Sequence, residues 1–173
     1  MPVRAVIDAM GGANAEAVFL TGTGGEEIPD GLPPETIQVE RSVPKAAMDQ
    51  AILAWEMNGE PVPLAHGGPL RLIISGYYGV NNVKYLKRLA LTVDESPNKI
   101  QQTGYRMRPV GVKGDPSQPS MYEMSVKSWI TGPLLDAATG KVQIHGVAMG
   151  GVSGLEKIEV STDGGQNWAE AQF

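Results

Sequence analysis

Hydrophobic residues recur with helical spacing at the start of the chain and again before its middle. The first pattern predicts a short helix over residues 2–12, which two glycines would end. The second pattern predicts a longer helix over residues 45–57, ended by Asn58-Gly59. Its apolar face would consist of Met48, Ile52, Leu53 and Trp55.

Short apolar runs in the same part of the chain predict extended segments. These runs are residues 17–21, 37–43, 70–74 and 89–93. Residues 70–74 are almost continuously apolar, so we expect a strand that is buried on both faces. Between residues 22 and 34, seven of thirteen positions are Gly or Pro, which predicts a loop. The G-T-G-G in this loop is followed directly by Glu26 and Glu27, which would repel an anion, so it does not indicate a phosphate-binding loop.

The pattern changes near residue 94. As far as Ser120 the chain is polar and rich in proline, which predicts an irregular crossing segment. Beyond it apolar residues recur with a period of two, which predicts short strands separated by glycine-containing turns. These strands would cover residues 126–130, 142–146 and 158–162. Their spacing predicts a β-sandwich of the immunoglobulin type, but only about four of its roughly seven strands fit before residue 173.

The predicted fold class is therefore α+β, with two domains. The first would comprise residues 1–115 and the second, a truncated sandwich, residues 116–173. The hydrophobic content of 42% fits a folded protein, and the net charge of −5, with no basic stripe, argues against nucleic-acid binding. The chain has no cysteine, which excludes a thiolate metal site within these residues. It has no run of 18 apolar residues, so no membrane span is expected.

Three side chains suited to anionic oxygens flank a glycine-rich turn between residues 65 and 86. Arg71 offers a guanidinium fork, Lys84 a point charge and His66 one hydrogen bond. Glycines at positions 67, 68, 76 and 79 would let a ligand approach the backbone closely. Together with a short helix expected near Asn81, this arrangement predicts a site for a phosphate-bearing cofactor. The alternative is that Arg71 and Lys84 are solvated surface charges and that His66 caps a turn.

Other conspicuous side chains receive mainly structural interpretations. Tyr77 and Tyr78 would either line the cofactor pocket or pack in the core, and the sequence favours neither. His145 is expected to be exposed on its strand and not to bind a metal. Trp129 and Trp168 are expected to fill the core of the second domain.

Two further features favour ordinary surface structure over a binding site. Arg106 and Arg108 flank Met107 and are expected to be solvated, although a place in the cofactor cleft or at a partner remains an alternative. The run Asp163-Gly164-Gly165 predicts a hairpin turn, because a calcium loop would need more carboxylates.

Ordered motifs surround the three cationic side chains. M-N-G-E-P-V-P, H-G-G-P-L-R, S-G-Y-Y-G and V-K-Y-L follow one another between Met57 and Leu86. This order resembles the signature of the sulfite oxidase family of molybdenum enzymes, whose pattern is M-N-G-x-P-L-P, H-G-x-P-x-R, P-G-x-x-G and V-K-W-L. E-R-S-V-P resembles the S-I-P strand end of that family. V-K-S-W-I-T-G-P and V-S-T-D-G-G-Q-N-W resemble the start of its immunoglobulin-like dimerisation domain.

The resemblance implies that residues 1–115 are the C-terminal half of a molybdopterin-binding domain. In the family the matching side chains bind the terminal phosphate of the pterin, so His66, Arg71 and Lys84 would do so here, with Gly79 beside them. The metal-binding cysteine of the family has no counterpart among these residues, and no metal ligand is expected. A family tyrosine that gates proton-coupled electron transfer corresponds to position 39, which is Val39 here. This chain alone is therefore expected to be inactive.

The activity implied by the resemblance is oxidation of sulfite, or of a similar small oxyanion, with electrons passed to a haem acceptor such as cytochrome c. A nitrate reductase or sulfane dehydrogenase relative is one alternative, and a non-catalytic module for cofactor binding or dimerisation is another. The resemblance also implies a homodimer formed through the second domain and a periplasmic location.

Overall fold

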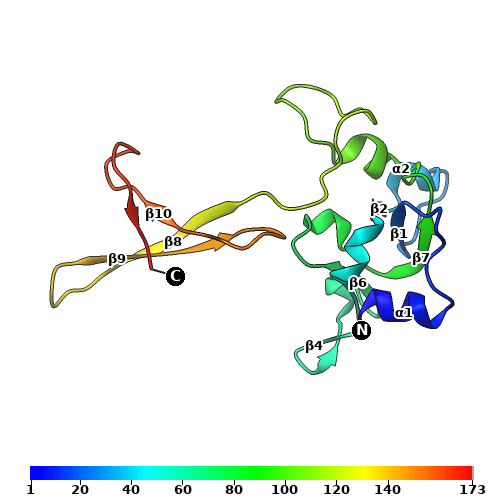
Figure 1. The fold of residues 1–173 in the computed structure, drawn as a ribbon, viewed down its shortest axis with the longest axis horizontal. Helices are drawn as coiled ribbons and strands as arrows, with labels where there is room; N and C mark the ends of the chain where they lie inside the picture. Colours follow the sequence, from blue (N-terminus) through cyan, green and yellow to red (C-terminus); the bar gives the residue numbers. More distant parts are fainter. Residues whose placement is uncertain (173) are drawn as a thin grey trace. The chain divides into compact units, whose positions relative to one another are not determined.

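The computed structural model describes residues 1–172. They form two compact units, the first comprising residues 1–122 and the second beginning at Glu123. Strands dominate both units and the helices are short (Figure 1). No helix among the described residues is long and apolar enough to cross a membrane.

An antiparallel sheet of three strands forms the centre of the first unit. Strand β1 (Phe19–Gly24) lies between β2 (Glu40–Pro44) and β7 (Leu86–Thr92). Residues opposite one another in the ladder share a face of the sheet, and Leu20 pairs with Val43 on one side and Leu91 on the other. The next position along β1 is Thr21, whose hydroxyl lies 2.8 Å from the hydroxyl of Ser42. One face of the sheet therefore carries Leu20, Val43 and Leu91, and the other carries the hydroxyl groups of Thr21 and Ser42.

A second sheet pairs β3 (Ala51–Ala54) with β6 (Arg71–Ile74), and it contradicts the helix predicted over residues 45–57. A 3₁₀ turn covers Lys45–Asp49, and the chain is extended from Ala51. Leu53 is buried and Ile52 is 41% exposed, which is the alternation of a strand. Pairing with β6 therefore overrides the helical spacing.

The expected helix end at Asn58-Gly59 is a hairpin turn. It joins β4 (Glu56–Met57) to β5 (Glu60–Pro61). Asn58 and Gly59 both have positive φ, 56° and 82°, as a type I′ turn between two paired strands requires. Asn-Gly therefore reverses the chain here and does not end a helix.

The remaining helices of the first unit are single turns or little more. Helix α1 (Val3–Ala9) confirms the N-terminal prediction, and Val3 is fully buried against the core. Short turns cover Pro34–Ile37 (α2), Leu64–His66, Gly79–Asn81 and Ile100–Gly104. The core consists of Val3, Leu20, Val43, Ala47, Met48, Ala51, Leu53, Leu72, Ile74, Tyr77 and Val83.

Three further predictions for the first unit differ from the structure, in the start of a loop, the burial of a strand and the length of a helix. The loop begins at Gly25 and not at residue 22, because β1 continues through Gly24. Strand β6 is not buried on both faces: Leu72 and Ile74 are buried, whereas Arg71 and Ile73 are only half-buried. The helix expected near Asn81 is a single 3₁₀ turn that ends at this residue.

The second unit consists of two antiparallel strand pairs. Strand β8 (Lys127–Leu135) pairs with β9 (Val142–Met149), and β10 (Glu159–Val160) pairs with β11 (Ala169–Glu170). Trp129 and Trp168 do not fill a core: 49% and 61% of their surfaces are exposed. Among the described residues this unit has only two pairs of strands, which are too few for the two packed sheets of a sandwich.

The side chains at two other positions of this unit behave as predicted. His145 is exposed on β9. Asp163 forms a turn, in which its carboxylate accepts hydrogen bonds from the backbone N–H groups of Gln166 at 3.0 Å and Asn167 at 2.9 Å. The backbone and side-chain hydrogen bonds from Asn167, and then that from the Ser161 hydroxyl, lower the pKa of Asp163 to about 2.

Candidate functional site

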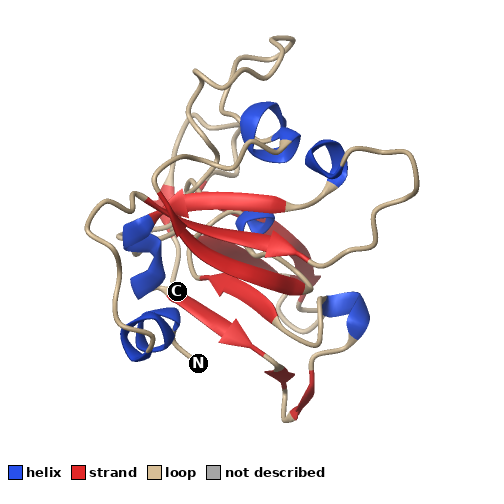
Figure 2. Cartoon of the chain, turned by 90° about the vertical axis from the view of Figure 1, so that its right-hand side faces the viewer, coloured by secondary structure: helices blue, strands red, loops and turns tan. Residues whose placement is uncertain are grey.

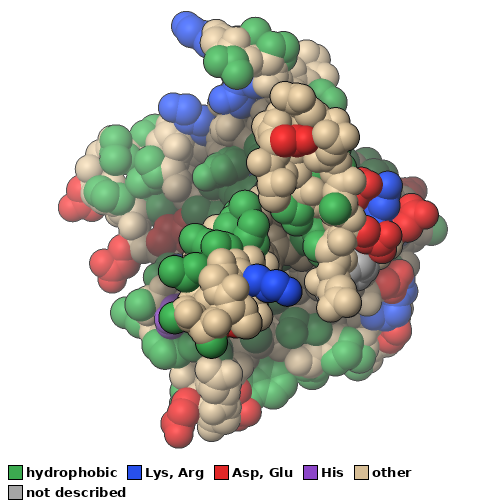
Figure 3. Space-filling view, turned by 90° about the vertical axis from the view of Figure 1, so that its left-hand side faces the viewer, with side chains coloured by type: hydrophobic (Ala, Val, Ile, Leu, Met, Phe, Trp, Pro, Cys, Tyr) green, Lys and Arg blue, Asp and Glu red, His purple; other side chains and the backbone are tan. Residues whose placement is uncertain are grey.

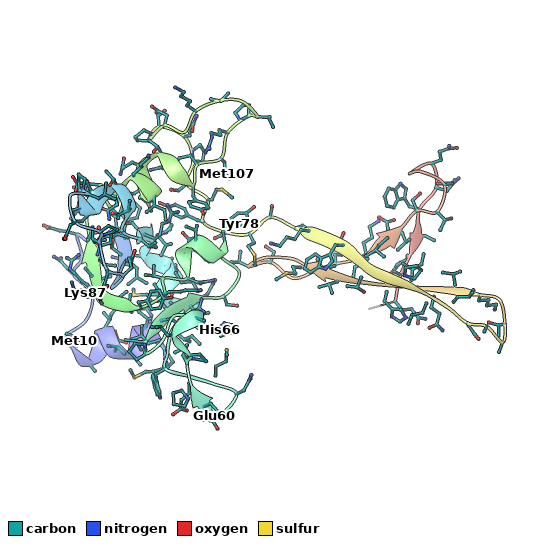
Figure 4. The ribbon with its side chains drawn as sticks, turned by 180° about the vertical axis from the view of Figure 1, so that it is seen from behind. Met10, Glu60, His66, Tyr78, Lys87 and Met107 are labelled. Atoms are coloured by element: carbon teal, nitrogen blue, oxygen red, sulfur yellow. The ribbon has the colours of Figure 1, made fainter. Side chains whose placement is uncertain are left out.

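The three predicted anion-binding residues lie around one turn of the first unit. His66, which is labelled in Figure 4, ends the 3₁₀ turn Leu64–His66 and is exposed. The Arg71 guanidinium donates a hydrogen bond to the carbonyl oxygen of His66 at 2.5 Å. The Lys84 ammonium donates to the carbonyl oxygen of Ala65 at 2.9 Å. Two cationic side chains therefore converge on neighbouring carbonyl groups of the turn that carries the imidazole.

Backbone pairing explains why residues distant in sequence meet here. The N–H of Leu72 donates to the carbonyl of Val83 at 2.9 Å, and the N–H of Tyr85 donates to the carbonyl of Gly67 at 2.9 Å. Arg71 precedes Leu72, and Lys84 lies between Val83 and Tyr85. The backbone pairing therefore fixes both side chains beside the same turn.

The turn itself depends on a close approach. Gly67 has φ +96°, and a Cβ at this position would lie 2.5 Å from Cγ of Lys84. Glycine is therefore required both by the backbone conformation and by the space that the lysine occupies. A side chain at this position would displace one of the two cations.

One atom of the site has no hydrogen-bond partner in the part of the chain that the structure describes. The Nε of Arg71 is buried and makes no hydrogen bond. A buried N–H without an acceptor costs about 1–3 kcal/mol, which an oxygen of a bound ligand would recover. A guanidinium with an unpartnered Nε–H, an ammonium and an exposed imidazole together suit a phosphate group, whose ionised oxygens accept hydrogen bonds.

Buried polar groups anchor the turn Gly79–Asn81 on its side toward the interior of the unit. The side-chain oxygen of Asn81 accepts hydrogen bonds from Nε and Nη2 of Arg41 at 3.2 and 3.0 Å. Its side-chain nitrogen donates to the carbonyl oxygens of Met121 at 2.9 Å and Tyr122 at 3.1 Å. Each polar atom of the amide is therefore used within the protein, and the position of Gly79 is fixed from within.

Gly79, in contrast, faces open space. A Cβ placed on it would meet no atom within 4 Å, and its backbone does not need positive φ. Nothing in the protein therefore requires glycine at this position, which agrees with a role in contact with a ligand.

The structure distinguishes the two tyrosines that precede Gly79. Tyr77 is buried in the core, whereas Tyr78, which is labelled in Figure 4, is half-buried. The backbone N–H of Tyr78 donates to the carbonyl of Tyr122 at 2.9 Å, which anchors the turn at its start. Val39 packs against the core, and its backbone N–H donates to the carboxylate of Glu26.

Arg106 contradicts the prediction that it is a solvated surface charge. It is 5% exposed, and its guanidinium lies 2.6 Å from the carboxylate of Glu95. The Tyr122 hydroxyl donates to the same carboxylate. Burial opposes ionisation of Glu95, but these two hydrogen bonds outweigh it and hold its pKa below the ordinary value. Burial, and then the bond to Glu95, raises the pKa of Tyr122 to about 12. Arg108 is exposed, as predicted.

Sequence patterns did not indicate that Arg41 and Asn81 are buried and hydrogen-bonded to each other. Arg41 is 1% exposed and also donates to the carbonyl oxygen of Ile100 at 3.0 Å. Burial lowers its pKa to about 10, since no carboxylate forms an ion pair with it among the described residues. Among residues 1–172, no cluster of three or more His, Asp or Glu side chains could hold a metal ion.

Comparison with known families supports a division into two functional modules. Residues 1–100 match the family model described as an oxidoreductase molybdopterin binding domain. Residues 118–173 match the model described as a Mo-co oxidoreductase dimerisation domain.

Individual relatives agree with these matches. The mitochondrial sulfite oxidase of Mus musculus is 37% identical over 143 residues, which cover 76% of this chain and 26% of the relative. The sulfite oxidase of Arabidopsis thaliana is 37% identical over 127 residues, or 69% of this chain and 32% of the relative. A crystal structure of the sulfane dehydrogenase SoxCD from Paracoccus pantotrophus aligns with a TM-score of 0.75 and 27% identity, covering 99% of this chain and 42% of that chain. The chain thus spans about a quarter to two fifths of the length of these relatives.

Proposed function

The chain belongs to the sulfite oxidase family of molybdopterin-binding oxidoreductases, and on this premise we propose that His66, Arg71 and Lys84 bind the phosphate group of the pterin, with Gly79 lying against the cofactor. The observation that carries the proposal is the buried Nε of Arg71, a donor with no hydrogen-bond partner among residues 1–172. The residues present fit the group, since all three side chains can donate to phosphate oxygens and none is a carboxylate that would repel them.

The roles of the three side chains follow from their contacts. Arg71 would donate two hydrogen bonds in one plane, from Nε and from the guanidinium nitrogen that the carbonyl of His66 does not occupy. Lys84, whose ammonium already donates to Ala65, retains two further donors for the anion. His66, which is exposed as Lys84 is, would close the site from the solvent side.

When bound, the cofactor supplies the redox chemistry. We propose that the complete protein oxidises sulfite or a similar small sulfur oxyanion and passes the electrons to a haem acceptor such as cytochrome c. The likeness to sulfane dehydrogenase SoxCD favours a sulfane-type substrate as the second candidate. The periplasm is proposed as the location.

The test of cofactor binding compares Arg71→Ala with Arg108→Ala in the complete gene product that carries this chain. Arg71→Ala removes a donor pair from the site, so the pterin retained after purification is expected to fall by about tenfold or more. Arg108→Ala removes an exposed guanidinium that donates to the backbone carbonyl of Val112 at 3.0 Å, and pterin retention should not change. Pterin is measured by the fluorescence of its oxidised form. Equal losses in the two variants would contradict the assignment.

We further propose that the second unit is the beginning of an immunoglobulin-like sandwich that mediates homodimer formation. The support is the apolar surface of β8 and β9, which is too extensive for an isolated strand pair in water. The exposed side chains include Trp129, Ile130, Leu134, Leu135, Val142, Ile144 and Val147. Sedimentation velocity of the complete protein is expected to show a dimer, and Trp129→Glu should shift it toward monomer. A protein that stays monomeric at every concentration would contradict this proposal.

A further inference from the structure

A loop of the first unit, residues 107–113, presents apolar side chains to water. Val110 is fully exposed, Met107 is 55% exposed and Val112 is 47% exposed, and these three side chains are called the apolar tip below. The loop projects beyond the strands and helices of the first unit (Figures 1 and 2). Lys and Arg side chains (blue) lie beside hydrophobic ones (green) at the top of Figure 3. Three exposed apolar side chains within seven residues form a local surface that a partner could cover.

Hydrogen bonds within the loop hold its shape. Arg106, at its base, is buried and donates to the carbonyl oxygen of Gln118 at 3.0 Å. The Arg108 guanidinium turns back and donates to the carbonyl oxygens of Val112 at 3.0 Å and Arg106 at 3.1 Å. The N–H of Val112 donates to the carbonyl of Pro109 at 3.2 Å. The apolar tip is therefore preorganised, so little conformational entropy would be lost when it is covered.

The segment that contains the loop is cationic, although the chain is acidic. Residues 96–114 contain four Lys or Arg residues and no Asp or Glu. The whole chain has 14 Lys or Arg and 19 Asp or Glu residues, so the rest of it carries 10 and 19 and has a net charge of −9. Three of the four cations are exposed: Lys99, Arg108 and Lys113. This separation of charge would turn the loop toward an anionic surface and the rest of the chain away from it.

The composition of the apolar tip distinguishes between two kinds of anionic surface. Interfaces between proteins are anchored mainly by Trp, Tyr and Arg side chains that fill pockets of the partner. The tip has no aromatic side chain, and the guanidinium of Arg108 is bonded to its own loop. A bilayer needs no complementary pocket, because apolar side chains enter the acyl region while long cationic side chains reach the phosphate groups of the lipids. The observations therefore favour a lipid surface over an acidic protein.

We infer that residues 107–113 bind the surface of an anionic lipid bilayer, with the apolar tip inserted among the lipids and with Arg108 and Lys113 at the level of the phosphate groups. Each exposed cation near such a surface contributes roughly fivefold to the binding constant, and the apolar side chains contribute further. Because much of the attraction is electrostatic, the binding is reversible and weakens with salt. The inference rests on neither the proposed cofactor site nor the proposed substrate, so its test can fail independently of theirs.

Sedimentation with lipid vesicles tests the inference. The complete gene product that carries this chain is mixed with vesicles of phosphatidylglycerol and phosphatidylcholine in equal parts, or with vesicles of phosphatidylcholine alone. The anionic vesicles are expected to bind the protein about tenfold more tightly or better. Raising the salt concentration from about 0.1 M to about 1 M should weaken that binding about fivefold or more, because it shortens the screening length from about 10 Å to about 3 Å.

Two pairs of variants test the residues. Val110→Asp places a charge in the apolar tip and should lower binding about tenfold or more, with an unchanged circular dichroism spectrum because Val110 is fully exposed. Leu32→Asp adds the same charge at a loop residue that is 48% exposed, and binding should not change. Lys113→Gln removes an exposed cation of the loop and should lower binding about fivefold. Lys87→Gln removes an exposed cation outside residues 96–114 and is its control.

A fluorescent label distinguishes insertion from electrostatic attraction alone. The chain has no cysteine, so Val110→Cys gives the full chain a single position for an NBD label. On anionic vesicles the NBD emission should shift to shorter wavelength and be quenched by nitroxide groups on the acyl chains. The same label attached through Leu32→Cys should show neither effect.

Three results would overturn the inference. The first is failure of the wild-type protein to bind anionic vesicles, or binding that Val110→Asp leaves unchanged. The second is equally tight binding to soluble poly-glutamate, because the partner would then be an acidic protein. The third is slow amide exchange across residues 107–113 of the complete gene product without vesicles, because the rest of that protein would then cover the loop.

Discussion

Arg41→Met is expected to lower the free energy of unfolding of the first unit by about 3 kcal/mol, because buried acceptors lose their only charged donor. The side-chain oxygen of Asn81 would lose two hydrogen bonds and the carbonyl of Ile100 one. Both acceptor groups are buried or partly buried, so water cannot readily replace the guanidinium. Part of the loss is offset because the variant no longer buries a charge, as the lowered pKa of Arg41 indicates.

Urea unfolding measures this loss, with Trp129→Phe and Trp168→Phe in the background so that Trp55 alone reports on the first unit. Arg41→Lys tests the geometry: one ammonium cannot reach both acceptors as the fork does, so most of the loss should remain. Arg108→Met is the surface control and should change the stability by less than about 0.5 kcal/mol. A loss for Arg41→Met no larger than that of the control would contradict the role assigned to the buried arginine.

The elements that the sequence predicted correctly are those whose signals are local. Apolar runs next to glycine or proline indicated β1, β2, β6 and β7 within a few residues, and helical spacing indicated α1. The helix predicted over residues 45–57 was wrong, because a four-residue strand and a hairpin turn have too little length to show a period of two clearly. The local pattern could not show that β6 would be its partner.

The candidate site shows the same division between local and distant information. His66, Arg71 and Lys84 lie within one motif-rich stretch, and the structure brings all three to one turn. Arg41 and Asn81 are 40 residues apart, and neither lies in a pattern that predicts burial. Arginine is normally exposed, so only the tertiary structure shows that this one supports the turn at Gly79.

The wrong prediction for Arg106 has the same origin. A charged residue in a polar, proline-rich segment is usually solvated, and nothing in the sequence pairs it with Glu95. In the structure the segment folds back on itself, with a bridge between Arg106 and Ser120. Tyr122 then reaches the same carboxylate, so the irregular segment is ordered by one buried ion pair.

Gly68→Ala is expected to destabilise the first unit by about 3 kcal/mol and to lower pterin retention with it. A Cβ on Gly68 would lie 1.9 Å from the carbonyl oxygen of Val62, which is backbone and cannot rotate away. Relief requires the turn that carries His66 to shift relative to Arg71. Thermal unfolding measures the first effect and pterin fluorescence the second.

Gly79→Ala is the matched control, because a Cβ there meets no atom within 4 Å. Its stability should equal that of the wild type, whereas its pterin retention should fall if the cofactor lies against Gly79 as proposed. The two variants therefore separate two reasons for having glycine. At position 68 the absence of a side chain allows the turn to fold, and at position 79 it would leave room for the ligand. Normal retention in Gly79→Ala would remove this residue from the site, and unchanged stability in Gly68→Ala would show that the backbone near Val62 can move to accept a side chain.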